Sequence, residues 1–494
     1  MDAGDSAGKD EKTFSSDRGK YWQGEKLVSQ SAPPGELFQA PEELEPIAIV
    51  GAGYVGLVTG VCLASTGRSV TLVEVDPQRR SLIAQGDAPF YEPGLDTLLR
   101  QVVDAGRLTV VADLAVVLNT HKLVVLAVGT PSLPDGRSDL TALDEVIATI
   151  AEHAESGTVV VVKSTVPPGT GRRLQRQLGD DDRGLQVVSC PEFLREGCAV
   201  EDITRSDRFV VGGRDEGAVS RVVAALNPFD APVLRSGNTE AELIKYGSNA
   251  FLAMKISFIN EIANLCDQMN ADIDGVSHGM GLDARIGSAS LRAGLGFGGS
   301  CFPKDVAALE HAARREGFTF WMLRSAIEVN EQQRMRFVQK IRDAVGNDLE
   351  GRRVAMLGLS FKPGTDDMRQ APSLAIATRL LELGASVIAH DPVAMKEAQA
   401  IMPGVEFAAD VYSAVEDADV IAVVTEWPEY LAIDWQRAAS LVRRRAVVDG
   451  RNCLNPATLA LHGFNYHGIG RPALTLQWER RESDRLVASA GHRA

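Results

Sequence analysis

The sequence of 494 residues contains few cysteines, and none of them form a Cys-x-x-Cys pair. A structural zinc site or a disulfide framework would need such pairs or regular cysteine spacings, so neither is indicated. Scattered thiols are typical of a reducing cytosol, and we expect a cytoplasmic protein without a bound metal. The six cysteines are Cys62, Cys190, Cys198, Cys266, Cys301 and Cys453.

The chain also lacks an excess of basic residues and lacks a long apolar run. Its formal net charge of −15 argues against a nucleic-acid or anionic-membrane partner, because such partners are held by clustered lysine and arginine. The longest apolar runs, such as residues 123–128, are too short to cross a bilayer, and the N-terminus shows no signal peptide. A small anionic ligand held by a few local cations stays compatible with this charge.

The length and the 45% content of hydrophobic residues predict two or three domains with substantial cores. Residues 1–46 are rich in Gly, Ser, Pro and charge without an apolar period, which predicts a disordered N-terminal extension. Residues 473–494 are expected to form a polar C-terminal tail.

A dinucleotide-binding fingerprint opens the folded part. The apolar run 47–50 leads directly into Gly51-Ala-Gly53-Tyr54-Val55-Gly56, and a helical pattern covers residues 57–66. In this context the glycines permit a tight turn, close approach of a pyrophosphate and close helix packing.

An acid follows this fingerprint at the expected distance. Glu74 lies near the end of a strand predicted over residues 69–75, where a carboxylate can accept hydrogen bonds from ribose hydroxyls and repel a 2′-phosphate. The pattern therefore favours NAD over NADP, although Arg79 and Arg80 close behind leave that preference open.

The strand and helix alternation continues with predicted strands at 123–128, 158–162 and 185–189. Ligands of open α/β sheets bind beyond the carboxyl ends of the strands. Four polar residues in the turns after these strands are therefore placed to face one ligand, although taken singly each also suits ordinary turn and capping chemistry. They are Thr130, Thr165, Glu192 and Glu196.

A second α/β unit begins near residue 346, with strands predicted at 353–361, 385–389, 420–425 and 446–449. It has no Gly-x-Gly-x-x-Gly. Lys362, Arg369 and Arg451 follow its strands instead, and such cations suit phosphate groups.

One long helix is predicted over residues 240–269, apolar on more than one face and therefore largely buried. It is placed to link the two α/β units and to supply a subunit interface. Lys245 and Asn249 lie four residues apart on one face. A buried cation and amide need a partner, and a bound polar ligand and a structural ion pair are equally compatible with the spacing.

The segment 294–305 reads Gly-Leu-Gly-Phe-Gly-Gly-Ser-Cys-Phe-Pro-Lys-Asp. Pro303 is suited to a first helical turn, which places Cys301 at a helix N-terminus beside Lys304. The helix N-terminus and Lys304 both favour a thiolate at Cys301, and the thiolate is the form that attacks a carbonyl. The alternative is a small buried hydrophobic cysteine.

Together these segments resemble the UDP-glucose/GDP-mannose dehydrogenase family from about residue 47 to 472. The motifs that carry the resemblance recur in order, and they are Gly51–Leu57, Tyr91-Glu-Pro-Gly-Leu95, Lys163-Ser-Thr-Val-Pro-Pro-Gly-Thr170, Pro191-Glu-Phe-Leu-Arg-Glu-Gly197, Ala241–Tyr246 through Asn260, Gly294–Asp305, Gly358–Pro363 and Asp449-Gly-Arg-Asn452.

The resemblance implies an α/β fold in which two Rossmann-like, doubly wound parallel-sheet domains are joined by a long central helix. The expected regions are an NAD-binding domain at 47–238, a central helical and dimerisation region with the catalytic cysteine at 239–345, and a UDP-sugar-binding domain at 346–472. A homodimer or higher homo-oligomer is implied, with the long helix at its core.

The implied reaction is a four-electron oxidation of a sugar CH2OH to a carboxylate, with NAD as cofactor. The resemblance assigns Cys301 as nucleophile, Lys245 and Asn249 to oxyanion stabilisation, and Asp305, Thr165 and Glu192 to the hydrolytic water. The implied cofactor positions are Gly51, Gly53, Tyr54, Val55, Gly56, Glu74, Arg79, Thr130, Thr165, Glu196, Lys304 and Arg369. The implied substrate positions are Glu192, Phe193, Leu194, Arg195, Glu196, Lys245, Asn249, Arg285, Arg292, Gly294, Phe297, Gly298, Lys362 and Arg451, of which Arg285 is expected to reach a neighbouring subunit.

Two departures from the family pattern stand out: Glu74 replaces the usual Asp, and the N-terminal extension has no counterpart. The motifs favour UDP-glucose as substrate. A sister enzyme for UDP-N-acetyl-hexosamine or GDP-mannose is the nearest alternative. A non-catalytic nucleotide-sugar sensor is another, against which the joint presence of Cys301, Lys245, Asn249 and Asp305 argues.

Overall fold

The structure is a computed structural model that describes residues 44–179 and 182–474. The tail predicted at 473–494 lies outside the described residues except for its first two positions, and the extension predicted at 1–46 lies outside them up to residue 43.

The first α/β unit is built on a sheet of the order β3-β2-β1-β4-β5-β6-β7-β8. Neighbouring strands pair parallel except at one place, where β7 pairs antiparallel with β6 through Gly212 and Ser189, so that β7 and β8 run opposite to the other strands. The strands are β1 (Ile47–Val50), β2 (Val70–Val73), β3 (Leu108–Val111), β4 (Leu123–Leu126), β5 (Val159–Val162), β6 (Gln186–Ser189), β7 (Phe209–Gly212) and β8 (Val233–Ser236). The helices of this unit are α1 (Tyr54–Ser65), α2 (Pro77–Ala84), α3 (Leu95–Asp104), α4 (Leu114–Leu118), α5 (Thr141–His153), α6 (Thr170–Leu178), α7 (Ala199–Thr204), α8 (Glu216–Leu226) and the 3-10 turn η1 (Asn227–Phe229).

The second unit has an all-parallel sheet of the order β11-β10-β9-β12-β13-β14. Its strands are β9 (Arg353–Leu357), β10 (Ser386–His390), β11 (Glu406–Phe407), β12 (Val420–Val423), β13 (Ala446–Asp449) and β14 (Asn465–His467). Its helices are α13 (Pro372–Glu382), α14 (Met395–Ile401), α15 (Val411–Val415), α16 (Pro428–Leu431), α17 (Trp435–Leu441) and α18 (Pro456–Leu461). The predicted fold class is confirmed by these two sheets and the helix between them.

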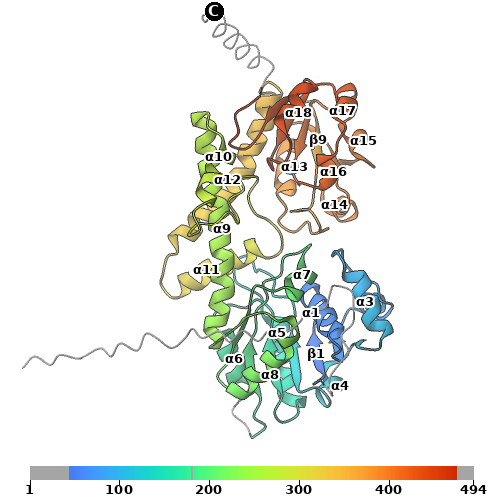
Figure 1. Cartoon of the computed structure of the whole chain (residues 1–494), viewed down its shortest axis with the longest axis vertical. Coiled ribbons are helices and arrows are strands. Elements are labelled where there is room, and N and C mark those ends of the chain that lie inside the picture. The colour runs from blue at the N-terminus through green and yellow to red at the C-terminus, as the bar shows by residue number, and fades with distance from the viewer. Residues whose placement is uncertain (1–43, 180–181, 475–494) are drawn as a thin grey trace, which may run out of the picture. The chain divides into compact units, whose positions relative to one another are not determined.

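Helix α9 (Asn238–Met269) connects the two units and is followed by α10 (Ile273–Gly281), α11 (Phe302–Arg315) and α12 (Trp321–Ala344) (Figure 1). It contacts α6, β6 and β7 of the first unit as well as α10, α11 and α12. Its predicted burial is only partly correct. Within the described residues, Leu243, Phe251, Phe258 and Leu265 are 46%, 60%, 52% and 53% exposed, so one apolar face of α9 is uncovered.

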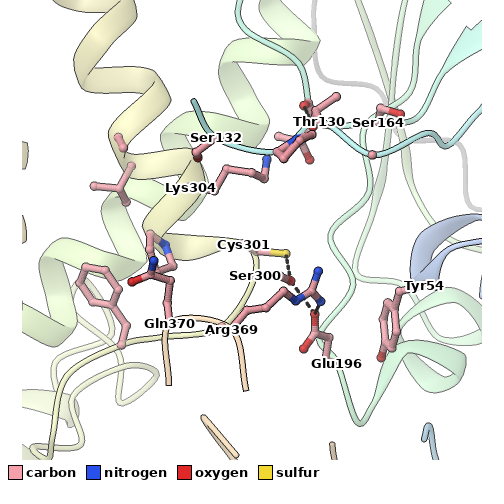
Figure 2. A pocket seen from close by; sticks show the side chains of 18 of the residues that line it. Tyr54, Thr130, Ser132, Ser164, Glu196, Ser300, Cys301, Lys304, Arg369 and Gln370 are labelled. Atoms are coloured by element: carbon pink, nitrogen blue, oxygen red, sulfur yellow. Dashed lines mark hydrogen bonds and ion pairs between the residues drawn. The ribbon is translucent and has the colours of Figure 1, made fainter. Parts of the chain in front are cut away.

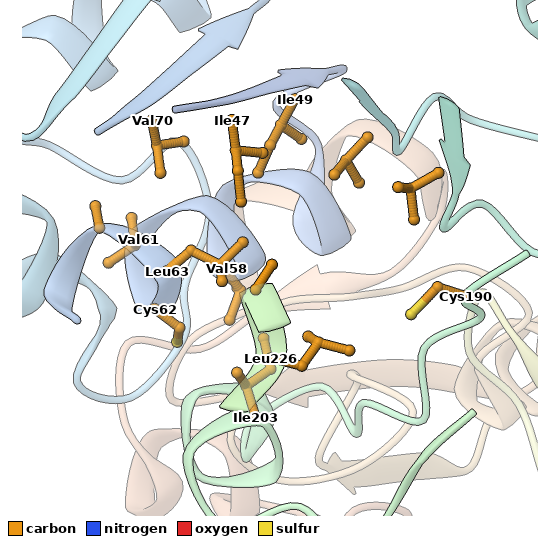
Figure 3. Close-up of a cluster of buried hydrophobic side chains, with 14 of the residues drawn as sticks. Ile47, Ile49, Val58, Val61, Cys62, Leu63, Val70, Cys190, Ile203 and Leu226 are labelled. Carbon is orange, nitrogen blue, oxygen red and sulfur yellow. The ribbon is translucent and has the colours of Figure 1, made fainter. Parts of the chain in front are cut away.

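Each sheet of the described chain has apolar clusters on both faces. In the first unit α1 packs on the strands β1 and β2, where Ile47, Ile49 and Val70 meet Val58 and Val61 (Figure 3). The approach is close at Gly60, because a Cβ there would lie 2.9 Å from Cδ2 of Leu72. None of the helices in the two described ranges is long and apolar enough to cross a membrane.

Leu72 tests how much this contact stabilises the fold. Leu72 is fully buried, and Leu72→Ala should lower the free energy of unfolding by about 2–5 kcal/mol through lost burial and a residual cavity. The matched control is Leu82→Ala on α2, because Leu82 is 40% exposed and should cost much less. Urea unfolding followed by circular dichroism measures both, and equal losses would contradict the packing described.

Candidate active site

A cavity lies between the glycine-rich turn before α1, the loops after β4, β5 and β6, the N-terminus of α11 and a loop of the second unit. Its volume is about 1120 Å³. Twelve of the residues predicted from the sequence line it: Gly53, Tyr54, Val55, Thr130, Thr165, Glu192, Leu194, Glu196, Phe297, Cys301, Lys304 and Arg369. Figure 2 shows several of them converging on one space.

The glycine-rich turn is shaped by steric exclusion. A Cβ on Gly51, whose φ is +93°, would lie 2.8 Å from the carbonyl oxygen of Ala127. A Cβ on Gly56 would lie 1.8 Å from the carbonyl oxygen of Gly51, whereas Gly53 has open space in front of it. A side chain at Gly51 or Gly56 would therefore clash with neighbouring backbone, whereas Gly53 leaves room for a ligand at the start of α1.

Glu74, the acid predicted to bind the ribose, contacts the glycine-rich turn itself. Glu74 accepts a hydrogen bond from the backbone N–H of Ala52 at 3.1 Å and pairs with Arg79 at 3.3 Å. Neither Glu74 nor Arg79 is among the residues that line the cavity.

Cys301 is the N-cap of α11, with Pro303 in the first turn, as the sequence predicted. Its Sγ lies 3.4 Å from the Ser300 Oγ (Figure 2). Burial raises the pKa of the Cys301 thiol to about 11; Glu192 and Asp305 add to the rise, and the Lys245 ammonium opposes it. The interpretation that the helix end and Lys304 favour a thiolate is opposed here by burial and by the two carboxylates, and Lys304 itself pairs with Asp305 at 2.7 Å.

Behind Cys301 lies a buried network of charges. Lys245 Nζ is 2.8 Å from Glu192 Oε1, and both side chains are almost fully buried. Asn249 Nδ2 donates to Asp305 Oδ2 at 2.6 Å. Lys245 and Asn249, which share one face of α9, therefore both contact protein carboxylates.

The charges in this network sustain one another. Burial alone lowers the pKa of Lys245, but Glu192, Asp305 and Cys301 outweigh it and the net shift is upward. Burial alone raises the pKa of Glu192, but Lys245 and the backbone N–H of Leu194 outweigh it and the net shift is downward. Both groups are held in their charged forms.

Glu196 has a different environment. Burial and the neighbouring Asp367 raise its pKa to about 7, while Ser300 Oγ donates to its Oε1 at 2.6 Å and Arg369 lies 3.6 Å away. Its Oε2 has no hydrogen-bond partner among the described residues. Asp367 and Arg369 come from the loop after β9, so this carboxyl faces the second unit.

The two units touch closely beside Glu196. A Cβ on Gly197 would lie 2.8 Å from the carbonyl oxygen of Gly364, so the backbones meet without side chains between them. Glu92 holds this turn in place by accepting from the N–H groups of Gly197 and Ala199 and from the Tyr54 hydroxyl.

The other predicted residues do not line the cavity in the described chain, and three of the cations are engaged elsewhere. Arg195 pairs with Asp202, and the 89%-exposed Arg285 pairs with Asp283. Arg451 donates to the carbonyl oxygens of Val424 and Phe361 at 2.6 and 2.9 Å. The remaining positions outside the cavity lining are Gly51, Gly56, Glu74, Arg79, Phe193, Lys245, Asn249, Arg292, Gly294, Gly298, Asp305 and Lys362.

Several lining residues were not predicted. Asn330 and Arg334 project from α12, where Asn330 Oδ1 accepts from the Phe297 N–H at 2.7 Å and Arg334 donates to the Phe297 carbonyl at 3.1 Å. Ser300 and Gln370 also line the cavity. Ser300 lies within the glycine-rich motif and could have been found there, whereas helix α12 carries no local motif that points to a site.

The chain matches three models of one family in succession. They are the NAD binding domain of the UDP-glucose/GDP-mannose dehydrogenase family at residues 45–230, its central domain at 239–332 and its UDP binding domain at 355–456. The chain belongs to the UDP-glucose/GDP-mannose dehydrogenase family. It is an NAD-dependent oxidoreductase, as predicted.

Relatives cover nearly the whole described chain. The UDP-glucose 6-dehydrogenase TuaD of Bacillus subtilis is 42% identical over 435 residues, which are 87% of this chain and 94% of that protein. A UDP-glucose 6-dehydrogenase of Pseudomonas aeruginosa is 43% identical over 441 residues, 86% of this chain and 97% of that protein. Among solved structures, a UDP-glucose dehydrogenase from Pyrobaculum islandicum is 36% identical with a TM-score of 0.81, covering 88% of this chain and all of that one.

The raised pKa of Cys301 predicts slow alkylation at neutral pH. The rate with iodoacetamide, followed for the Cys301 peptide by mass spectrometry, should increase with pH toward the pKa of about 11. Lys245→Met removes the opposing ammonium, so the pKa of the thiol should rise further. Because only the thiolate reacts, alkylation at a given pH should slow by about tenfold for every pH unit that the pKa rises.

Lys255→Met is the matched control, since Lys255 also lies on α9 but donates to the carbonyl oxygens of Ile286 and Gly287. It should leave the rate unchanged. Equal or faster alkylation in Lys245→Met would contradict the electrostatic coupling described.

Proposed function

We propose that this chain oxidises UDP-glucose to UDP-glucuronate at the cavity lined by Cys301, with NAD+ as the oxidant in two successive steps. The observation that carries the proposal is the presence of Cys301 in the same cavity as the glycine-rich turn, with Lys245, Asn249 and Asp305 buried behind it. The relatives above, named as UDP-glucose dehydrogenases at 36–43% identity, support UDP-glucose as the substrate.

The residues around the first wall fit a dinucleotide. Gly53 leaves open space at the start of α1, a place where backbone N–H groups and the helix dipole favour a pyrophosphate. Thr130, Thr165, Glu196, Lys304 and Arg369 line the same cavity toward Cys301. NAD+ would supply the hydride acceptor, with one molecule used in each of the two oxidations. In this proposal Gly51 and Gly56 allow the tight turn at the pyrophosphate, and Glu74 and Arg79 belong to the cofactor-binding positions, with the Glu74 carboxylate accepting from the ribose hydroxyls.

Cys301 would act once the substrate alcohol has been oxidised to the aldehyde. Its sulfur forms a bond to the carbonyl carbon as the C=O π bond opens, the thiol proton passes to the carbonyl oxygen, and the resulting thiohemiacetal retains the C–H hydrogen needed for the second oxidation. Loss of that hydride and of the hydroxyl proton leaves a thioester on Cys301. Water then attacks the thioester, the C–S bond breaks, and the carboxylate product and the free thiol are released.

The buried network would supply charge where this chemistry needs it. Lys245 is a fixed ammonium in a dry environment, which is the setting in which a cation stabilises a developing oxyanion most strongly. We assign Asn249 to the same task. Asp305, one helical turn from Cys301, would orient or deprotonate the water together with Thr165 and Glu192.

The remaining predicted positions form the proposed sugar-nucleotide site. These are Phe193, Leu194, Arg195, Arg292, Gly294, Phe297, Gly298, Lys362 and Arg451, with Arg285 reaching a neighbouring subunit. The proposed division of the chain is an NAD-binding region at 47–238, a central region at 239–345 and a UDP-sugar-binding region at 346–472.

The stoichiometry of NADH tests the reaction. At saturating NAD+ the absorbance change should correspond to two NADH for each UDP-glucose consumed, because both oxidations occur before release. One NADH per sugar would mean that the reaction stops at the aldehyde. Turnover only with an N-acetylated or GDP-linked sugar would overturn UDP-glucose as the substrate.

The role of Cys301 has its own test. Cys301→Ala should abolish formation of the acid while the affinities for NAD+ and UDP-glucose, measured by calorimetry, stay near those of the unmodified protein. Cys266→Ala, the same change on α9, should keep full activity. Loss of binding together with turnover in Cys301→Ala would make the cysteine structural.

We further propose a homodimer formed through α9. Phe251, Phe258 and Leu265 are exposed at seven-residue spacing, so they form one stripe along the helix. Leu265→Glu should shift the chain toward the monomer in light scattering, because a charge would be buried in the interface. Leu461→Glu on α18, at a residue 85% exposed, should leave the assembly unchanged. A dimer that survives Leu265→Glu would exclude this face.

A further inference from the structure

Helix α9 carries a buried carboxylate, Glu242, one helical turn before Lys245. Glu242 is 3% exposed. Its Oε2 accepts from the Gly169 N–H at 2.6 Å, and its Oε1 accepts from the Gly171 N–H at 2.7 Å and from the Ser189 Oγ at 3.0 Å. It pairs with no cation in the described structure, and no step proposed above uses it.

The three donors belong to the two segments that carry candidate catalytic residues. Gly169 ends the loop that begins after β5 and contains Thr165, and Gly171 lies in the first turn of α6, which follows that loop directly. Ser189 is the last residue of β6 and stands three positions before Glu192. The carboxylate of Glu242 is thus a direct link between α9, the Thr165 loop and the Glu192 loop.

The surroundings leave little freedom for this link. A Cβ on Gly171 would lie 2.6 Å from the Ser189 Oγ and 2.9 Å from Glu242 Oε1, so only glycine allows α6 to approach. A void of about 10 Å³ lies between Glu242 and Lys245 and is also lined by Ser164, Thr165 and Ser189. This space is about enough for one water molecule, so a displacement of Glu242 would be passed to its neighbours.

We infer that Glu242 is a positioning residue of the proposed reaction: it fixes Lys245 relative to Glu192 and Thr165 by tying the three segments that carry them to one carboxylate. The inference rests on the proposed function for the roles of those residues. Both oxygens are needed, because one reaches the Thr165 loop alone and the other reaches α6 and β6 together.

Two variants separate the geometry from the charge. Glu242→Gln keeps the shape but replaces one accepting oxygen by an NH2 group that cannot accept from a backbone N–H. Glu242→Asp keeps the charge but is one methylene shorter. Both should lower kcat on the order of tenfold to a hundredfold, with the dissociation constant of NAD+ changed by less than about threefold. Glu240→Gln, the same change at an exposed site on α9, is the matched control and should be silent.

Alkylation of Cys301 gives a readout independent of substrate. If Glu242 acted only as a nearby negative charge, Glu242→Gln would lower the pKa of Cys301 and speed alkylation, and Glu242→Asp would change nothing. If Glu242 holds Lys245 in place, both variants slow alkylation, because the ammonium that lowers the thiol pKa is displaced.

The inference is overturned if either variant keeps kcat within twofold of Glu240→Gln, or if alkylation speeds up in Glu242→Gln. It is also overturned if NAD+ affinity and the thermal midpoint collapse together with kcat in both variants, since Glu242 would then support the whole domain. The absence of turnover with UDP-glucose in the unmodified protein would instead refute the proposed function and leave the alkylation result standing.

Discussion

The candidate site depends on keeping charged groups out of water. A buried ammonium or carboxylate is costly unless it is paired and hydrogen-bonded, so Lys245, Glu192 and Asp305 can remain inside only as a set. That requirement explains why α9 passes directly behind the cysteine motif. The helix supplies Lys245 and Asn249, the loop after β6 supplies Glu192, and α11 supplies Asp305 and carries Cys301 at its N-cap. The ends of the strands place the loop that carries Glu192, and the ion pair of Glu192 with Lys245 fixes the distance between that loop and α9.

The same burial gives the cysteine its resting state. With its pKa raised to about 11, Cys301 is a thiol at neutral pH and not a ready nucleophile. A thiol that is held protonated in this way is protected from alkylating and oxidising agents, because these attack the thiolate. Burial raises the pKa of the thiol most, the carboxylates of Glu192 and Asp305 add to the rise, and the Lys245 ammonium opposes it. A small change in the distance from Lys245 to the sulfur therefore changes its reactivity.

Much of the fold could be predicted from the sequence because buried parallel strands are continuous apolar runs. β1, β4, β5, β9 and β12 were found in this way. β3, β8, β11 and β14 were missed, since short strands toward the edges have mixed burial, as in Leu108–Val111, or only a few residues, as in Glu406–Phe407. β7 was missed although all four of its residues are buried. The antiparallel pairing of β6 with β7 depends on tertiary contacts that no local pattern encodes.

Prediction of the site succeeded where a motif fixes the backbone and failed where side chains choose partners. The glycine spacing pointed to Gly53 and Cys301, and both residues line one cavity. It could not tell that Lys304 turns to Asp305, that Arg451 serves backbone carbonyls, or that Glu242 spans two loops. Those outcomes depend on distances between segments far apart in the sequence, and the apolar face of α9 was misjudged because periodicity does not show what covers a helix.

The cavity has walls from three separate stretches of chain: the glycine-rich turn and its neighbouring loops, the cysteine motif with α12, and the loop around Arg369 and Gln370. The near contact between Gly197 and Gly364 joins the first and last of these with nothing but backbone. Neither half of the molecule, produced as a fragment, would contain all the residues that line the cavity. The cavity is complete only in the assembled chain, and a ligand that contacts both halves would stabilise their association.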